Sequence, residues 1–154
     1  MTNNDVLRKV RYTFDYNDDK MMALFNAGGQ EVTRAELSDW LKKDEDPDFK
    51  GIYDKQLATF LNGFIIEKRG KRDGDEQPVP EKSLNNNIIF RKLKIALALT
   101  DDDIIEIFQL SDFTASKPEI SALFRNPAHK HYRLCKDQFL RNFLLGMQFK
   151  FHKK

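Results

Sequence analysis

The side chains most able to do chemistry in this sequence gather in one segment of its second half. His129, Lys130 and His131 precede Cys135, which gives His131 and Cys135 the i, i+4 spacing of two ligands on one helical turn. A structural zinc site needs four ligands, and no further histidines or cysteines have the spacing to complete one. We therefore interpret residues 129–131 as a solvated basic loop, and we predict neither a metal nor a cofactor.

Other reactive groups also have simpler interpretations. Three consecutive aspartates begin at Asp101, but consecutive carboxylates point to different sides of a helix and suit its N-terminal dipole better than a cation. Cys135 aligns with Ile52 in the other half of the chain, which favours a small buried side chain over a nucleophile. No set of titratable groups predicts catalysis, so an enzyme ranks third among the possible functions.

Basic residues spaced three apart give the sharper binding signal, because the same helix face recurs in both halves. These residues are Arg8, Lys9, Arg11, Arg91, Lys92 and Lys94. Solvated charge opposite an apolar stripe explains them, and so does contact with phosphate groups. The pattern leaves both interpretations open.

Charge is unevenly distributed along the 154 residues, whose net charge is +2. Residues 86–154 hold 12 Lys/Arg and 7 Asp/Glu, a net of +5, whereas residues 1–70 hold 11 and 13, a net of −2. The single cysteine excludes an intramolecular disulfide. The polar start MTNNDVLRKV and the lack of long apolar runs predict a cytoplasmic protein with no membrane association.

The two halves of the chain are diverged copies of one unit. A shift of 83 positions aligns residues 3–69 with 86–152 without a gap, giving 14 identities in 67 pairs. Chance would give roughly four. We predict a first helical repeat at 1–70, an exposed linker rich in charge and proline at 71–85, and a second helical repeat at 86–154.

Each copy is predicted to hold four helices. The first covers about 5–15 and about 88–99, with the Asn3-Asn4 and Asn86-Asn87 pairs as N-caps. The helix at 88–99 is apolar nearly all round, which places it near the centre of the molecule. The second helices begin at Asp18 and Asp101, after good N-cap residues.

The third and fourth helices have equally clear signals. Thr33 and Ser116 each stand three residues before a glutamate, which is the pattern of a capping box. The fourth helices follow Asp54 and Asp137, and each carries a glycine in its middle, which indicates close approach of another helix. The fold class is all-α: a tandem four-helix unit packed as a pseudo-twofold assembly, whose axis we place through the helix at 88–99 or the glycine-bearing helices.

Two features bear on partners. The second and third helices resemble a helix-turn-helix, but their connection is too long for that motif and Glu36 would repel phosphates. The loop after the third helix is acidic at 43–48 and carries His129, Lys130 and His131 at 126–131. We expect the two loops to contact surfaces of different charge.

Several segments together resemble a known family. They are NNDVLRKVRY at 3–12, FLNGFIIEKRG at 60–70, NNN at 85–87 and DQFLRNFLLG at 137–146. They resemble the YehS-like family, small bacterial proteins made of a duplicated domain of unknown function. The resemblance covers nearly the whole chain and implies a bacterial cytosolic protein. It implies no activity, cofactor or site residue.

The sequence thus predicts a non-catalytic binding module. Its candidate binding surface comprises Arg8, Arg11, Arg91, Lys92, Lys94, Arg125, His129, Lys130, His131, Tyr132 and Arg133. Interleaved acidic residues favour a protein partner. The alternative is nucleic acid, bound by the basic second half with help from Lys150, Lys153 and Lys154.

Overall fold

The computed structural model describes residues 1–71 and 77–153, and every regular element within them is an α-helix. The first repeat contains α1 (Asn3–Thr13), α2 (Asp18–Ala27), α3 (Arg34–Leu41) and α4 (Asp54–Arg69). The second contains α5 (Asn86–Ala96), α6 (Asp101–Leu110), α7 (Lys117–Leu123) and α8 (Asp137–Phe151). The predicted all-α fold and tandem duplication are confirmed.

Local sequence sets the start of most helices. Asn17 caps α2 and Thr100 caps α6, each accepting a hydrogen bond from a backbone N–H of the first turn. Thr33 and Ser116 form complete capping boxes at α3 and α7, because the glutamate three residues on bonds back to the cap N–H. These predictions are confirmed.

The prediction for the first helix of each repeat is wrong in one respect. α1 and α5 begin at Asn3 and Asn86, and their N-caps are Thr2 and Asn85. The asparagine pairs therefore lie inside the first turn, where they are not caps. Thr2 outcompetes them in the first repeat, because Asp5 bonds back to its N–H and completes a capping box.

The second asparagine of each pair fastens its helix to a distant loop. Asn4 Nδ2 donates to the carbonyl oxygens of Trp40 and Lys50, both at 2.9 Å, and its Oδ1 accepts from the N–H of Ile52 at 3.1 Å. Asn87 makes the three equivalent bonds to the Leu123 and Arg133 carbonyls and the Cys135 N–H. Both asparagines are buried, so these bonds define the path of the chain after α3 and after α7.

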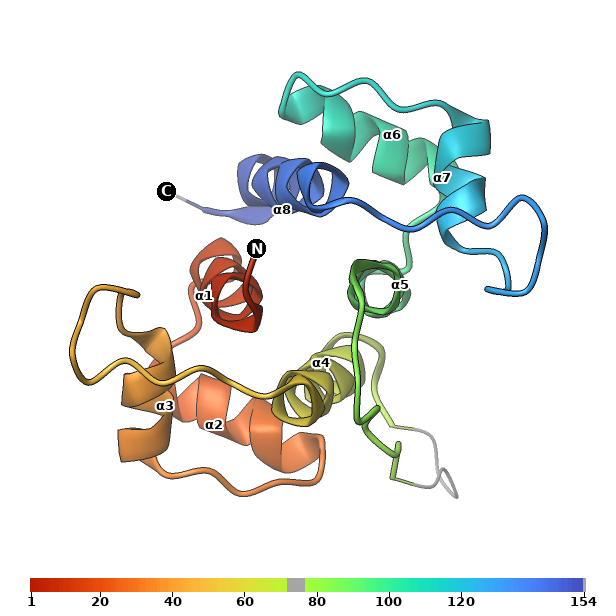
Figure 1. Cartoon of the computed structure of the whole chain (residues 1–154). Helices are drawn as coiled ribbons and strands as arrows, with labels where there is room; N and C mark the ends of the chain where they lie inside the picture. Colours follow the sequence, from red (N-terminus) through yellow and green to blue (C-terminus); the bar gives the residue numbers. More distant parts are fainter. Residues whose placement is uncertain (72–76, 154) are drawn as a thin grey trace.

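Four helices form the centre of the molecule (Figure 1). α1, α4, α5 and α8 lie there, with α2 and α3 at one end and α6 and α7 at the other. α4 packs on α5 and α1 packs on α8, so the first helix of each repeat contacts the last helix of the other. The pseudo-twofold axis therefore runs between these four helices, and our expectation that it passes through one of them was wrong.

The mid-helix glycines allow close approach of two helices within each repeat. A Cβ added at Gly63 would lie 1.8 Å from the carbonyl oxygen of Leu24, and one at Gly146 would lie 2.0 Å from that of Ile107. No side chain fits at either distance. The glycines let α4 pack on α2 and α8 pack on α6, as the sequence predicted.

The segment joining the repeats was predicted to be an exposed linker at 71–85, and its residues 72–76 lie outside the described part. Lys71, Pro78 and Val79 are exposed. Leu84, however, packs against the hydrophobic core, and its N–H donates to Asp54 at 2.8 Å. The end of this segment is therefore attached to the first repeat.

Candidate functional site

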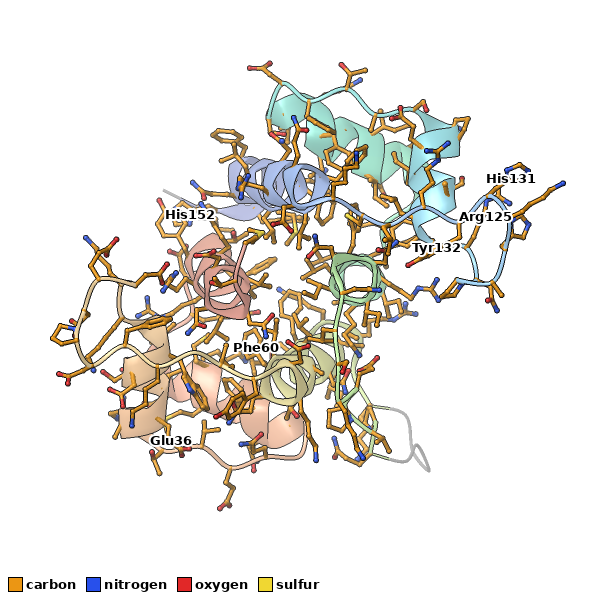
Figure 2. All side chains as sticks on the ribbon, viewed as in Figure 1. Glu36, Phe60, Arg125, His131, Tyr132 and His152 are labelled. Atoms are coloured by element: carbon orange, nitrogen blue, oxygen red, sulfur yellow. The ribbon has the colours of Figure 1, made fainter. Side chains whose placement is uncertain are left out.

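Several of the predicted site residues lie around the segment between α7 and α8. Figure 2 shows Arg125, His131 and Tyr132 together on this side of the second repeat. Arg91 on α5 lines one depression of about 400 Å³ with Arg125 and Tyr132. The structure therefore brings together residues separated by some forty positions in the sequence.

Two further depressions share residues with this one. The first, of about 370 Å³, adds Arg69 and Lys94 beside Arg91. The second, of about 670 Å³, extends past Arg125 and Tyr132. We call the combined surface the basic groove and define it by its seven cationic residues: Arg69, Arg91, Lys94, Arg125, Lys130, Arg133 and Lys136.

Acidic side chains lie near the basic groove: Glu81 lines one depression and pairs with Lys92, and hydrogen bonds with Ser116 together with the charge of Arg133 lower the pKa of Glu119. Among the described residues, none of the seven cations forms a salt bridge. Arg91 donates to the carbonyl oxygen of Phe124, and Lys94 lies 4.5 Å from the centre of the Phe124 ring. These contacts orient the side chains and leave their charge uncompensated.

The equivalent cations of the first repeat are all paired. Arg8, equivalent to Arg91, contacts Asp5 at 2.6 Å and Asp44 at 3.3 Å. Lys42 and Lys50, equivalent to Arg125 and Arg133, contact Asp39 at 2.7 and 3.6 Å. The hydrogen bond from Lys42 and the charges of both lysines lower the pKa of Asp39 despite partial desolvation.

The carboxylates that pair these cations are lost in the second repeat. The positions of Asp5, Asp39 and Asp44 are occupied there by Ile88, Ala122 and Pro127. The three cations are retained, and two lysines have become arginines. The second repeat has therefore exposed a set of positive charges that the first repeat neutralises internally.

Backbone contacts fix the shape of the basic groove. Asn87 accepts from Cys135 and donates to the Leu123 and Arg133 carbonyls, so it holds both ends of the segment. The Arg133 N–H also donates to the Ala122 carbonyl at 3.1 Å. A cationic surface held by buried bonds loses little freedom when it binds an anion.

Lys92 does not belong to the surface where the sequence placed it. Its side chain is buried, donates to Asn62 Oδ1 at 2.7 Å and pairs with Glu81 at 2.9 Å. The spacing predicted solvated charge, but α4 of the first repeat covers this position. Lys92 joins α5 to α4 and to the segment before α5.

Three further predicted residues are Arg11, His129 and His131, and the last of these lines one depression of the basic groove. Arg11 is on α1 of the first repeat, where it approaches Asp18 at 3.8 Å. His129 and His131 are exposed, and the His131 N–H donates to His129 Nδ1. Within the described ranges, no group of three or more His, Cys, Asp or Glu could hold a metal ion.

Cys135 is buried as predicted. Desolvation, together with the nearby charge of Asp137, raises the pKa of its thiol to about 12. The thiol is protonated at neutral pH, so it lacks the thiolate that a nucleophile requires.

Both repeats of this chain match one known protein family. Residues 3–70 and 86–152 each match the family described as "Protein of unknown function (DUF1456)". The chain belongs to the DUF1456 family. The two matches coincide with the two helical repeats seen in the structure.

One relative is similar to this chain over its whole length. The uncharacterized protein YehS of Escherichia coli (strain K12) is 42% identical over 154 residues, which is 100% of this chain and 99% of that protein. No solved structure matches. Within the described residues, no helix of this DUF1456 protein is long and apolar enough to cross a membrane.

Two cations of the basic groove in this DUF1456 protein were missed by the sequence reasoning. Arg69 is in the last turn of α4 and donates to the Ile95 carbonyl across the repeat boundary at 3.3 Å. Lys136 directly precedes α8. The signal that could have drawn attention to this surface is the loss of the aspartates equivalent to Asp5, Asp39 and Asp44.

Proposed function

We propose that this protein binds nucleic acid, and that the basic groove of the second repeat contacts the sugar–phosphate backbone. The observation that carries the proposal is a set of three arginines that form no salt bridge with the described residues: Arg91, Arg125 and Arg133. Their equivalents in the first repeat are paired with aspartates that the second repeat lacks. Guanidinium groups bind phosphate with two parallel hydrogen bonds, which ammonium groups do not match.

The form of the basic groove also suits an extended polyanion. Its depressions are shallow and adjoin one another, so cations are spread along a path instead of converging on one point. Tyr132 lines two of the depressions and offers an aromatic surface beside the charges. Proteins that bind nucleic acid without sequence preference combine such features.

A protein partner, which the interleaved charges of the sequence favoured, is the alternative. The exposed large apolar side chains come from separate elements, among them Tyr12 of α1, Leu110 of α6 and Phe149 of α8. Ile95 and Leu134 line the basic groove itself, and the three named above come from other elements, so we rank this alternative second. The sequence favoured the opposite order.

The test compares two triple variants by fluorescence anisotropy with single-stranded RNA, single-stranded DNA and duplex DNA. Arg91→Gln/Arg125→Gln/Arg133→Gln removes the unpaired cations, and Arg8→Gln/Lys42→Gln/Lys50→Gln removes the paired equivalents. Both lower the net charge by the same amount. We expect the first variant to bind about 100-fold more weakly and to lose about 2 units of the log–log salt slope. The second should bind within a few-fold of the parent.

Equal loss in the two variants would show that net charge alone attracts nucleic acid. Lack of binding by the parent protein to all three probes at about 50 mM salt would overturn the proposal and bring the protein partner to first place.

A further inference from the structure

The duplication creates two equivalent contacts between repeats, and they differ in how closely they are packed. At the α4–α5 contact, the side chain of Lys92 is buried and bonds to Asn62. At the α1–α8 contact, the equivalent Lys9 lines a solvent-open depression of about 650 Å³ and reaches Gln148 at 3.3 Å. The lysine is therefore covered at the first contact and borders an open depression at the second.

The pocket follows one face of each of two helices. We call it the α1–α8 pocket, and its lining residues are Met1, Asp5, Arg8, Lys9, Tyr12, Arg141, Leu145 and Gln148. The spacings along α1 and along α8 are those of a single helical face. Both faces cover about two turns, or roughly 10 Å.

Substitutions between the repeats account for the difference in packing. Arg141 occupies the position of Ala58, which is fully buried, and Tyr12 occupies the position of Ile95. Arg141 is exposed, and Tyr12 is 50% exposed. Long polar side chains therefore line the α1–α8 contact, whereas a small alanine allows α4 to pack closely.

Two cations line the α1–α8 pocket without forming a salt bridge to the described residues, and the charge of Arg141 acts on Asp137, one turn earlier on α8. Arg8 is paired with Asp5, so that couple contributes little net charge. Lys9 bonds only to the neutral amide of Gln148, and Arg141 forms no hydrogen bond or salt bridge with the described residues. The pocket therefore presents two positive charges to a ligand.

Tyr12, one of the residues that line the α1–α8 pocket, is part of a stacked aromatic pair. The rings of Tyr12 and His152 stack with centroids 4.2 Å apart and an angle of 13°. His152 is held by the Tyr12 carbonyl at 2.8 Å and by Asp15 at 3.6 Å. Tyr12 remains 50% exposed beside this contact, and it contributes to the lining of the pocket, so its ring offers a planar ligand an aromatic surface.

We propose that the α1–α8 pocket binds a nucleoside 5′-monophosphate group. The phosphate lies between Lys9 and Arg141, and the base packs against Tyr12. The volume is within the roughly 300–1,000 Å³ of small-molecule sites. The group comes either from a free nucleotide or from the 5′-phosphorylated end of a strand. This proposal is independent of nucleic-acid binding by the basic groove.

Isothermal titration of the full chain with AMP and with adenosine tests the proposal. We expect saturable binding of AMP below about 5 mM and much weaker binding of adenosine, which lacks the phosphate. Lys9→Gln and Arg141→Gln should each weaken AMP binding about 10-fold. The matched controls are Lys55→Gln, an exposed position on α4, and Arg91→Gln in the basic groove, and both should bind AMP as the parent does.

A second arm separates the two sources of the nucleotide. A short strand with a 5′-phosphate is compared with the same strand carrying a 5′-hydroxyl, in the Arg91→Gln/Arg125→Gln/Arg133→Gln background. If the phosphorylated strand binds more strongly than AMP, the pocket binds the ends of strands. If AMP binds more strongly than the phosphorylated strand, the pocket binds the free nucleotide. Failure of both AMP and the phosphorylated strand to bind, or unchanged binding in the Lys9 and Arg141 variants, overturns the proposal.

Discussion

Asp39 and Ala122 occupy equivalent positions in the two repeats, and this difference separates a neutralised loop from a cationic one. Asp39 contacts both Lys42 and Lys50, whereas Ala122 gives the equivalent arginines no carboxylate. The backbone around both residues is held by the same asparagine bonds. The two repeats therefore share a scaffold and differ in the charge that they present.

Restoring this carboxylate should weaken binding to the basic groove. In Ala122→Asp, the new side chain can pair with Arg125 and Arg133 as Asp39 pairs with the two lysines. We expect about 10-fold weaker binding of nucleic acid at low salt, measured by anisotropy. Ala122→Asn is the control, because it has nearly the same shape without the charge. Equal effects of Asp and Asn would attribute the loss to packing.

The mid-helix glycines should not tolerate a methyl group. Gly63→Ala and Gly146→Ala place a Cβ within 2.0 Å of a backbone carbonyl oxygen, so whole helices must move apart. We expect each to lower the free energy of unfolding by about 3 kcal/mol, measured by urea denaturation. Gly51→Ala has nothing within 4 Å and should change it by less than about 0.5 kcal/mol. A small effect at Gly63 would contradict the close α2–α4 approach.

The buried asparagines should be needed as amides. Asn87→Asp retains an acceptor for the Cys135 N–H but turns the two donor bonds into contacts between a carboxylate and carbonyl oxygens. We expect a loss of about 3 kcal/mol in thermal or urea unfolding. Asn85→Asp is the matched control two residues away, because this N-cap uses only its acceptor oxygen and aspartate caps equally well. Similar losses in both variants would point to a general effect of charge.

The thiol of Cys135 should stabilise the fold in a pH-dependent way. Its pKa is raised from 9.0 to about 12 by burial. A raised folded-state pKa means that the stabilisation is complete below the unfolded pKa and is lost as pH rises toward the folded value. The difference in unfolding free energy between the parent and Cys135→Ala should therefore shrink between pH 7 and pH 10. A thiol reagent at pH 8 should label the native protein far more slowly than the urea-unfolded chain, and equal rates would contradict the burial.

Local signals in the sequence determined much of the fold. Caps such as Thr33 and Ser116 act within four residues, so their pattern alone predicts a helix start. The glycines at 63 and 146 predicted close helix packing because they recur at the same place. The role of Asn4 and Asn87 was missed, since their partners lie more than thirty residues away and nothing local distinguishes such a bond from a cap.

The site was predicted less completely, for the same reason. Arg91, Arg125 and Arg133 were among the candidates, but spacing on α5 also selected Lys92, whose burial depends on α4 of the other repeat. Arg8 was chosen by the same spacing, although Asp5, three residues earlier, pairs with it at 2.6 Å, and the distant Asp44 adds a contact at 3.3 Å. The local pair could have been predicted from the sequence, whereas the contacts with Asp44 and α4 join separate elements, which a helical pattern does not reveal.

The first helix of each repeat packs on the last helix of the other, as two subunits of a dimer would, yet both repeats belong to one chain and can diverge separately. In a symmetric dimer of a single repeat, any substitution would appear on both sides, so losing Asp39 would remove the neutralising carboxylate from both loops at once. Joining two copies in one chain, with α1 on α8 and α4 on α5, keeps the dimer-like architecture but frees each side to change alone. A neutralised face and a basic face can then coexist in one molecule, so that a ligand meets two different ends of an otherwise symmetric architecture.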